Sequence, residues 1–559
     1  MIQTVMTNTR ITANSQTTID HVITNQPTVQ TIVTHEAISD HQVLITSLGQ
    51  KTHKTPTNCP TTLQQKLDIT ETERKIKSLS WKTWLIENQN NDLETTYNSF
   101  HKTIQSCVTL QQKKPRKKKP NQPFFNNNLA QMRKILQKKR KTFLKKQTEE
   151  TENEYREYQK TYNNALNNAK QAYYESLMSK AGKDSKKIWN TINSILNRGN
   201  KENQKNTITS NGSEIHNNKT IANTFSKFYK TAATDKLKNI NQTKHFKDFL
   251  QASDKKHDTF KLQKITTYQT WQIIKSLSSK TSSGFDKIPP KLVKDCAENL
   301  APPLTMIINK CFETGSFPKT LKLAKITPIH KKGDREPANF RPISQLSTFS
   351  KIIEKAAHKQ LRIYMEDNHQ DPYQFAYKPA HSTTHPIILT RHIIEESLKK
   401  KEYVLLVMID LSLAFDCIET SEILPEKLKH YGADQITTRF FKEFFTGRKH
   451  QTEWNGAISE TQNLSNHSCV QGSCLGAPIY NLYTKDLQKV CKSTIVNFAD
   501  DTNIIVTSKN PNNLIEKANE ELKSISDYMS ANYLLINTKK HRHSYINQKP
   551  HQNMTKTPI

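Results

Sequence analysis

The chain has 559 residues, and 83 Lys and Arg against 51 Asp and Glu give a formal charge of +32. Only 34% of the residues are hydrophobic and the mean hydropathy is −0.77, so we expect packed cores in some segments and not along the whole chain. No apolar run reaches the roughly 18 residues of a membrane span, and the polar N-terminus excludes a signal peptide. The eight cysteines lack CxxC and zinc-ligand spacing, which predicts reduced thiols in an intracellular protein. So large a charge then indicates a polyanionic partner, most often nucleic acid.

Residues 47–112 are rich in Thr, Gln and Lys and are predicted to be a linker. A basic arm follows, because the segment from 113 to 146 holds fourteen Lys and Arg and no acid. Its first part, KKPRKKKP, should be extended, and an amphipathic helix is predicted from Asn128. The arm either contacts phosphates or serves as a nuclear import signal, or it is a solvated linker. The candidate nucleic-acid-binding residues are Lys113, Lys114, Arg116, Lys117, Lys118 and Lys119.

The rest of the region 113–198 should be helical, with a break near Gly182. Its Tyr and Leu residues recur at three- and four-residue spacing, which favours packing over base stacking. Residues 199–264 are rich in Asn and Lys and predict a linker with one peripheral helix around 221–229. Apolar runs, prolines and most informative glycines come later, so a compact domain is predicted at 265–541, followed by a tail at 542–559.

Two segments of this domain place acids at strand ends. The run YVLLVMIDLSLAFDCI (403–418) predicts a buried strand that leads to Asp410, followed by a helix after Ser412. The run TIVNFADDTNIIV (494–506) predicts a β-hairpin with Asp500 and Asp501 at its tip. An Asp-Asp pair alone usually only reflects the preference of Asp for turns.

Three carboxylates on adjacent strand ends would repel one another unless a divalent metal neutralised them. Hard oxygen ligands favour Mg²⁺, with Mn²⁺ as a substitute, and Mg²⁺ also binds substrate phosphates. Two such ions can stabilise the attacking and leaving oxygens of a phosphoryl transfer. The sequence therefore predicts a site for two Mg²⁺ ions.

These segments carry a family resemblance. MIDLSLAFDCI resembles motif A, VQGSCLGAPIYNLYTKDL (470–487) resembles motif B and FADD (498–501) resembles motif C of reverse transcriptases, particularly those of non-LTR (LINE-type, jockey-like) retrotransposons. Three further blocks resemble the family's fingers and one resembles its motif D: 280–296, 326–355, 374–383 and 534–541. The resemblance implies an α/β (α+β) fold, a right-hand polymerase palm and fingers whose sheet is covered by helices on one side.

The resemblance also implies residue roles. Asp410 and Asp500 match the two metal-binding aspartates of the family, and Asp501 is the third acid beside them. Phe415 matches the aromatic residue under the incoming sugar, where it would clash with a ribose 2′-hydroxyl and favour dNTPs. Ordinary core packing is the rival interpretation of Phe415. Lys540 matches a motif D lysine that could protonate the departing pyrophosphate, although it also lies in a Lys-rich tail.

Other matched positions concern the nucleotide and the template. Gln471, Gly472 and Ser473 match the motif B turn against the nascent base pair, where a small backbone permits close approach. Lys325 and Arg341 match basic fingers positions suited to triphosphate or template phosphate, which a guanidinium binds with two parallel hydrogen bonds.

The N-terminal segment shows a second resemblance. SQTTIDHVITN (15–25) and HEAISDHQVLI (35–45) resemble the last strands of the apurinic-type endonuclease of these elements, an endonuclease/exonuclease/phosphatase-type α/β sandwich. His41 would then be an acid/base oriented by Asp20, with Asp40 nearby. The upstream ligands of that family would precede Met1, so residues 1–46 are expected to be an inactive remnant. No thumb is recognisable after 541, and processive synthesis is not expected.

We therefore predict an RNA-directed DNA polymerase that takes an RNA template, a DNA primer or target DNA, and dNTPs. A nuclear location or a cytoplasmic ribonucleoprotein is expected, with no membrane association. The FADD sequence and Phe415 disfavour a viral RNA polymerase. The alternative is a catalytically inactive, decayed fragment of a mobile element that binds nucleic acid.

Overall fold

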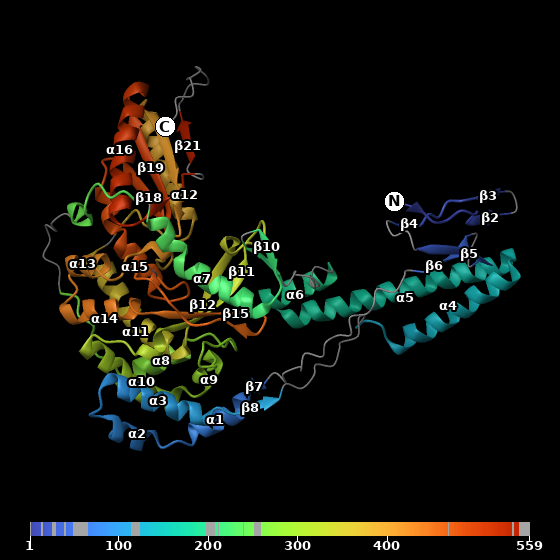
Figure 1. Cartoon of the computed structure of the whole chain (residues 1–559), viewed down its shortest axis with the longest axis horizontal. Helices are drawn as coiled ribbons and strands as arrows, with labels where there is room; N and C mark the ends of the chain where they lie inside the picture. The colour runs from blue at the N-terminus through green and yellow to red at the C-terminus, as the bar shows by residue number, and fades with distance from the viewer. Residues whose placement is uncertain are drawn as a thin grey trace. The chain divides into compact units, whose positions relative to one another are not determined.

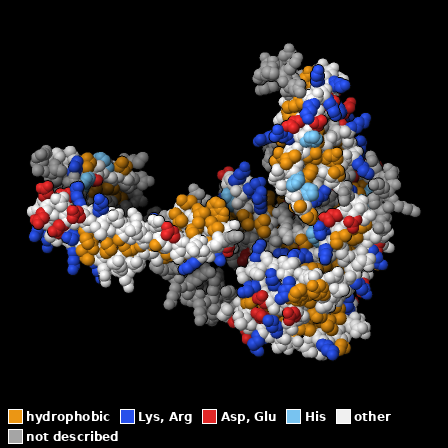
Figure 2. Space-filling view, turned by 180° about the vertical axis from the view of Figure 1, so that it is seen from behind, with side chains coloured by type: hydrophobic (Ala, Val, Ile, Leu, Met, Phe, Trp, Pro, Cys, Tyr) orange, Lys and Arg blue, Asp and Glu red, His pale blue; other side chains and the backbone are white. Residues whose placement is uncertain are grey.

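The computed structural model describes residues 2–12, 15–24, 29–37, 41–47, 65–112, 123–182, 184–196, 207–210, 212–238, 240–250, 259–369, 371–467, 469–538 and 542–546. These divide into two compact units, Met1–Lys66 with Gln112–Gln204 and Leu67–Gln111 with Lys205–Ile559. Lys and Arg side chains are spread over the visible face of both units (Figure 2). Within the described residues, no helix combines the length and the apolar character that crossing a membrane requires.

Short antiparallel ribbons form the N-terminal part of the first unit (Figure 1). The paired strands are β1 (Ile2–Gln3) with β4 (Ile23–Thr24), β2 (Arg10–Thr12) with β3 (Ser15–Thr17), and β5 (Gln30–Ala37) with β6 (Gln42–Ser47). The described parts of the two N-terminal segments that resemble an endonuclease are thus rich in β-strands.

The helical region of the first unit follows its sequence pattern closely. It contains α4 (Asn127–Lys146), α5 (Glu149–Ala181) and α6 (Ser185–Ile195). The α5 helix begins after Thr148, whose side chain accepts a hydrogen bond from a first-turn amide, and three glutamates of that turn complement the helix dipole. It ends at Gly182, where φ is +52°, so the predicted break is confirmed. The stacking of Phe143 on Tyr155, with ring centroids 6.2 Å apart, joins α4 to α5 by packing.

The predicted linker at 47–112 is wrong for residues 67–111, which are helical and belong to the second unit. They form α1 (Ile69–Lys77), α2 (Trp81–Asn88) and α3 (Leu93–Cys107), followed by β8 (Leu110–Gln112), which pairs with β7 (Gln65–Leu67). Phe100 is fully buried and packs edge-on against Phe349, with ring centroids 5.0 Å apart. A few apolar residues among many Thr and Gln residues suffice to pack these helices into the core, because they recur on one face of each helix.

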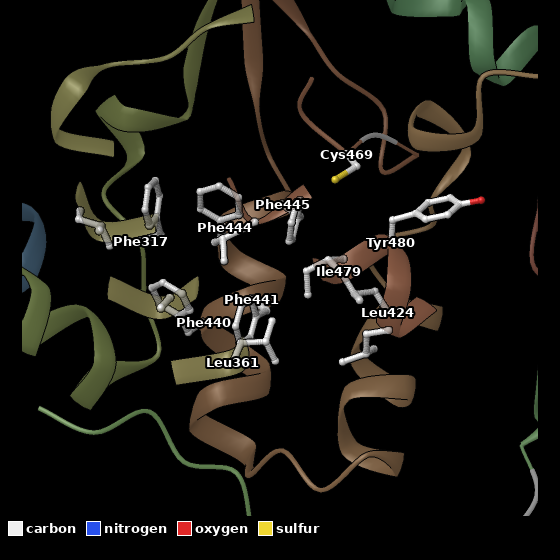
Figure 3. Close-up of a cluster of buried hydrophobic side chains, with 14 of the residues drawn as sticks. Phe317, Leu361, Leu424, Phe440, Phe441, Phe444, Phe445, Cys469, Ile479 and Tyr480 are labelled. Carbon is white, nitrogen blue, oxygen red and sulfur yellow. The ribbon is translucent and has the colours of Figure 1, made fainter. Parts of the chain in front are cut away.

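The largest core of the second unit lies between helices. These include α8 (Thr267–Lys275), α9 (Pro290–Asp295), α10 (Ala297–Thr314), α11 (Thr348–Asn368), α13 (Ile423–His430) and α14 (Gln435–Phe445). The α14 helix contributes Phe440, Phe441, Phe444 and Phe445, which lie at one-turn spacing and are all buried (Figure 3). Phe317 packs edge-on against Phe444, with ring centroids 5.0 Å apart. Such aromatic packing contributes a large part of the buried apolar surface of this core.

A five-stranded sheet lies beside this core in the order β12-β11-β15-β16, with β17 also paired to β15. Its strands are β11 (Leu323–His330), β12 (Phe340–Gln345), β15 (Lys449–Trp454), β16 (Ala457–Ile458) and β17 (Gln462–Asn463). The helix predicted around 221–229 is confirmed as α7 (Asn218–Leu237), which follows the β9 (Ile208–Ser210) and β10 (Ser213–Ile215) hairpin. Phe225 of α7 packs against Phe340 and Trp454 of this sheet.

A four-stranded antiparallel sheet has the order β18-β19-β13-β21. Its strands are β13 (Tyr403–Ile409), β18 (Thr494–Phe498), β19 (Asp501–Ser508) and β21 (Arg542–Ile546). Residues 542–546, predicted to be part of a tail, are therefore an edge strand paired with β13. The predicted tail misses this strand because HRHSYI has little apolar alternation.

Helices cover both faces of this sheet, so the expectation of a one-sided layer is wrong. Val404 packs in a cluster with Ile393 of α12 (Thr384–Lys399), whereas the next residue, Leu405, belongs to the main core with Leu514 of α16 (Pro511–Ala531). Successive residues of a strand point to opposite faces, so the two clusters lie on opposite sides. Both helices contact the strands and are seen beside them in Figure 1.

Candidate active site

Asp410 directly follows β13, as the sequence predicts. The apolar residues of this inner strand pack into both neighbouring clusters and fix its course. Beyond it, β14 (Leu411–Ser412) pairs with β20 (Leu535–Ile536), and this brings Asn537 to Asp410. The Asn537 side chain donates to Asp410 Oδ2 at 2.8 Å, and its backbone amide donates to the Asp410 carbonyl at 2.8 Å. The carboxylate is thereby oriented at the strand end.

The hairpin of β18 and β19 brings the other two acids to the same end of the sheet. Phe498 pairs with Asp501, so Ala499 and Asp500 form the two-residue turn between the strands. On the other side of β19, Thr502 pairs with Ile409, the residue before Asp410. The hairpin prediction is confirmed, but Asp501 is the first residue of β19 and not part of the turn. The register therefore gathers all three acids at adjacent strand ends.

Aromatic side chains lie beside these acids. Phe415 lies between Tyr377 and Tyr480, with ring centroids at 6.4 Å and 4.8 Å. Burial, and then the charge of Asp500, raise the pKa of both Tyr377 and Tyr480. The phenols therefore stay neutral near neutral pH. Phe415 thus forms part of an aromatic wall beside the acids and also packs against the core. Its place under the incoming sugar stays a prediction.

The loop before α15 (Gly476–Tyr483) contains a close backbone approach. Gly472 has φ of +115°, and a Cβ built there would lie 2.6 Å from the Ser344 carbonyl oxygen. The Ser344 amide in turn donates to the Gln471 carbonyl at 3.2 Å. The small residue predicted here is required by the β12 strand, because any side chain would collide with its backbone.

Two acids hold this loop from other elements. Glu354 of α11 accepts hydrogen bonds from the Ser473 hydroxyl at 2.7 Å and from the Cys474 amide at 3.2 Å. Asp416 accepts from Gln471 Nε2 at 3.0 Å. Burial raises the pKa of Asp416 from its ordinary 3.8 to about 7, against the opposing effect of the Gln471 hydrogen bond. Sequence patterns gave no sign of either acid's role.

Comparison with known proteins agrees with this arrangement. Residues 329–556 match the family described as "Reverse transcriptase (RNA-dependent DNA polymerase)". This segment contains Asp410, Phe415, the loop at 471–474 and the hairpin acids.

Several curated relatives match the same part of the chain. The chain is 28% identical over 283 residues to "Probable RNA-directed DNA polymerase from transposon BS" of Drosophila melanogaster, covering 48% of this chain and 31% of that protein. It is 26% identical over 259 residues to "RNA-directed DNA polymerase from mobile element jockey" of the same species, covering 44% and 28%. The aligned part therefore spans less than a third of these relatives, and the predicted resemblance to jockey-like elements is confirmed.

Lys325 and Arg341, the two predicted phosphate-binding residues, have different surroundings. Lys325 forms an ion pair with Glu453 of β15 at 2.8 Å, so its charge is partly neutralised. Arg341 is exposed on β12, and within the described residues its guanidinium has neither a hydrogen bond nor an ion pair. Arg341 is thus the better placed of the two to bind a phosphate.

Reverse transcriptases use divalent metal ions, which carboxylate oxygens can bind. Within the described ranges, no group of three or more His, Cys, Asp or Glu side chains converges closely enough to hold a metal ion. Mg²⁺, however, is commonly bound through one or two carboxylates, with substrate phosphates and water completing its octahedron. Asp410 and Asp500 offer the appropriate oxygen donors, so the residues fit such an ion.

The first unit brings together the predicted pair of Asp20 and His41. Asp20 Oδ2 lies 2.7 Å from His41 Nδ1, and the two side chains are 37% and 39% exposed. Hydrogen bonds from His41 and from Thr9 lower the pKa of Asp20. Three predicted groups lie outside the described residues, namely Asp40, Lys540 and the arm from Lys113 to Lys119.

Proposed function

We propose that this chain is an RNA-directed DNA polymerase of a non-LTR retrotransposon. One observation carries the proposal: the register of β18, β19 and β13 gathers Asp410, Asp500 and Asp501 at one end of a sheet, inside a domain of the reverse transcriptase family. Carboxylates on adjacent strand ends suit metal-assisted phosphoryl transfer. The relatives named as RNA-directed DNA polymerases support the same activity.

The four-stranded sheet with its helices would be the palm, and the sheet of β11, β12 and β15 would belong to the fingers. Asp410 and Asp500 would hold two Mg²⁺ ions. When bound, these ions would stabilise the attacking and leaving oxygens of the phosphoryl transfer. Asn537 would keep the Asp410 carboxylate in its orientation throughout the reaction, because it donates to one carboxylate oxygen.

In the reaction, the 3′-hydroxyl of a DNA primer attacks the α-phosphate of a dNTP on an RNA template, and pyrophosphate leaves. Phe415 would lie under the sugar and exclude a ribose 2′-hydroxyl. Gln471 and Gly472 would lie against the nucleotide, with Gln471 oriented by Asp416. Arg341, and Lys325 less strongly, would bind phosphate, and Lys540 would protonate the leaving pyrophosphate.

The basic arm would bind template RNA or target DNA through phosphates, without reading sequence. Its net charge suits either polyanion, since Lys and Arg that neutralise phosphates release counterions. Work on chromosomal DNA would require a nuclear location, and the arm's KKPRKKKP sequence suits import.

Primer extension on poly(rA)/oligo(dT) with dTTP and Mg²⁺ tests the proposal. We expect extension by the full chain and none by Asp500→Ala. Asp367→Ala serves as the control, because Asp367 is an exposed acid on α11, and it should extend like the parent chain. Absence of Asp500-dependent extension, with a folded parent chain, would overturn the polymerase assignment and favour a protein that only binds nucleic acid.

A further inference from the structure

Gln374 precedes Phe375 in the loop before α12, and only 3% of its surface is exposed. Its neighbours join the backbone of β18. The Asn497 amide donates to the Tyr373 carbonyl at 2.8 Å, and the Phe375 amide donates to the Asn497 carbonyl at 3.0 Å. This short parallel bridge fixes the loop against the strand that leads into the turn with Asp500.

The Gln374 side chain reaches the turn itself. Its Oε1 accepts hydrogen bonds from the Ala499 amide at 3.0 Å and from the Ala376 amide at 3.0 Å. Its Nε2 donates to the Ala499 carbonyl at 3.4 Å. One side-chain amide therefore contacts both the N–H and the C=O of Ala499, the residue directly before Asp500.

Ala499 has a backbone conformation that needs such support. Its φ is +57°, in the left-handed region that residues with a Cβ rarely adopt. A turn with alanine at this position would relax if its amide and carbonyl were free to pair elsewhere. Strained residues persist where their surroundings hold them, and they are frequent at functional sites.

We propose that Gln374 is a positioning residue for polymerisation: its side-chain amide holds Ala499 in the left-handed conformation and thereby fixes the direction in which the turn presents Asp500. The inference deepens the proposed function and rests on it. It requires no contact between Gln374 and substrate. Loss of the Gln374 amide would remove none of the three acids and would change the orientation of Asp500.

The decisive variant is Gln374→Met, which keeps nearly the same length and volume and removes all three hydrogen bonds. We expect kcat in primer extension to fall about 10- to 100-fold, the range for residues that orient a metal ligand, while KM for dTTP changes less than about threefold. We also expect the Ala499 amide to exchange with deuterium at least about tenfold faster, because its acceptor is gone.

Gln360→Met is the matched control. Gln360 of α11 makes the same two-bond contact with the backbone of Gln263, accepting from its amide at 2.7 Å and donating to its carbonyl at 2.9 Å. This contact lies on α11, outside the turn with Asp500. The control should leave kcat and the exchange at Ala499 unchanged.

Ala499→Gly separates strain relief from general packing, because glycine adopts positive φ freely. In the Ala499→Gly background, the further change Gln374→Met should lower kcat only about threefold or less. An undiminished loss in this background would overturn the proposal, and so would a normal Ala499 exchange rate in folded Gln374→Met.

If Gln374→Met fails to fold, Gln374→Glu provides the test. It keeps an acceptor oxygen for both amides and replaces the donor to the Ala499 carbonyl by a charged oxygen that repels this carbonyl, so a loss of kcat smaller than for Asp500→Ala is expected, and no loss overturns the proposal. Deuterium exchange needs no catalysis. An inactive parent chain with fast exchange in Gln374→Met would therefore contradict the polymerase assignment alone, whereas unchanged exchange would contradict only the positioning role of Gln374.

Discussion

Asp20 in the first unit and Asp410 in the second each lie within 2.8 Å of a side-chain nitrogen, yet the two carboxylates have different support. Asp20 and its partner His41 are more than a third exposed. Asp20 lies between β3 and β4, and His41 directly precedes β6, so both lie at the ends of short two-stranded ribbons. Asp410 follows an inner strand whose residues enter apolar clusters on both faces of a sheet. Precise chemistry needs ligands held by rigid elements, and only Asp410 meets that condition.

The largest expected effect tests this difference directly. Asp410→Ala removes a proposed metal ligand and should lower primer-extension kcat on the order of 10³-fold, since transition-state charge loses its stabilisation. Asp20→Ala in the same assay should leave kcat unchanged. Thermal unfolding of both variants checks that each remains folded. Equal losses of kcat from the two substitutions would mean that the support of Asp410 by an inner strand gives it no greater role in the reaction than Asp20 has.

Asp416 provides a test through pH. Its folded pKa, near 7, lies above its ordinary value of 3.8, so between these values the folded state binds more protons than the unfolded state. The free energy of unfolding should therefore fall as pH rises from about 4 to 7, by up to about 4 kcal/mol. Asp416→Asn should flatten this dependence and be the more stable protein above pH 7.

Urea unfolding of the parent chain and Asp416→Asn at several pH values measures that difference. Glu422→Gln is a suitable control, because Glu422 is an exposed acid shortly after Asp416 in the chain. A parallel pH dependence in the parent chain and in Asp416→Asn would show that the Asp416 carboxyl is hydrated, and the site would then be less tightly packed than its contacts indicate.

Phe415 should show a specific effect of intermediate size. Phe415→Val shortens the aromatic wall and should lower the preference for dTTP over UTP, as the ratio of kcat/KM values, on the order of 10²-fold. Tyr480→Phe keeps the ring that packs on Phe415 and should leave the ratio unchanged. A Phe415→Val variant that loses activity equally with both nucleotides would assign this ring to core packing alone.

The sequence located the elements that carry the acids because their signals are local. The apolar run before Asp410 and the β-rich runs around Asp500 predict strand ends, and both strands end as expected within a residue or two. The segment 67–111 was missed because its apolar residues are sparse and part of their packing is with helices far away in the chain, as for Phe100 against Phe349. Composition alone then resembles that of a linker.

Contacts between distant segments explain the other omissions. Gln374 is separated from Ala499 by 125 positions and Glu354 from Ser473 by 119, and no spacing rule connects such pairs. Gln374 lies inside a block that resembles the fingers, but its side chain contacts the turn of motif C. Only the folded chain shows that buried polar side chains from elsewhere hold both functional turns.

The smallest effect is expected at Asp20. Its pKa is lowered by His41 and Thr9, so any stability that it adds is present above its ordinary pKa and is lost as pH falls through the folded value. The pair is exposed, and water screens its attraction. Asp20→Asn should therefore change Tm by less than about 2 °C at pH 7, and differential scanning calorimetry of the full chain measures it. A larger shift in Tm would show that the Asp20–His41 pair stabilises the first unit substantially. Two partly exposed side chains would then do for the first unit what the buried core does for the second.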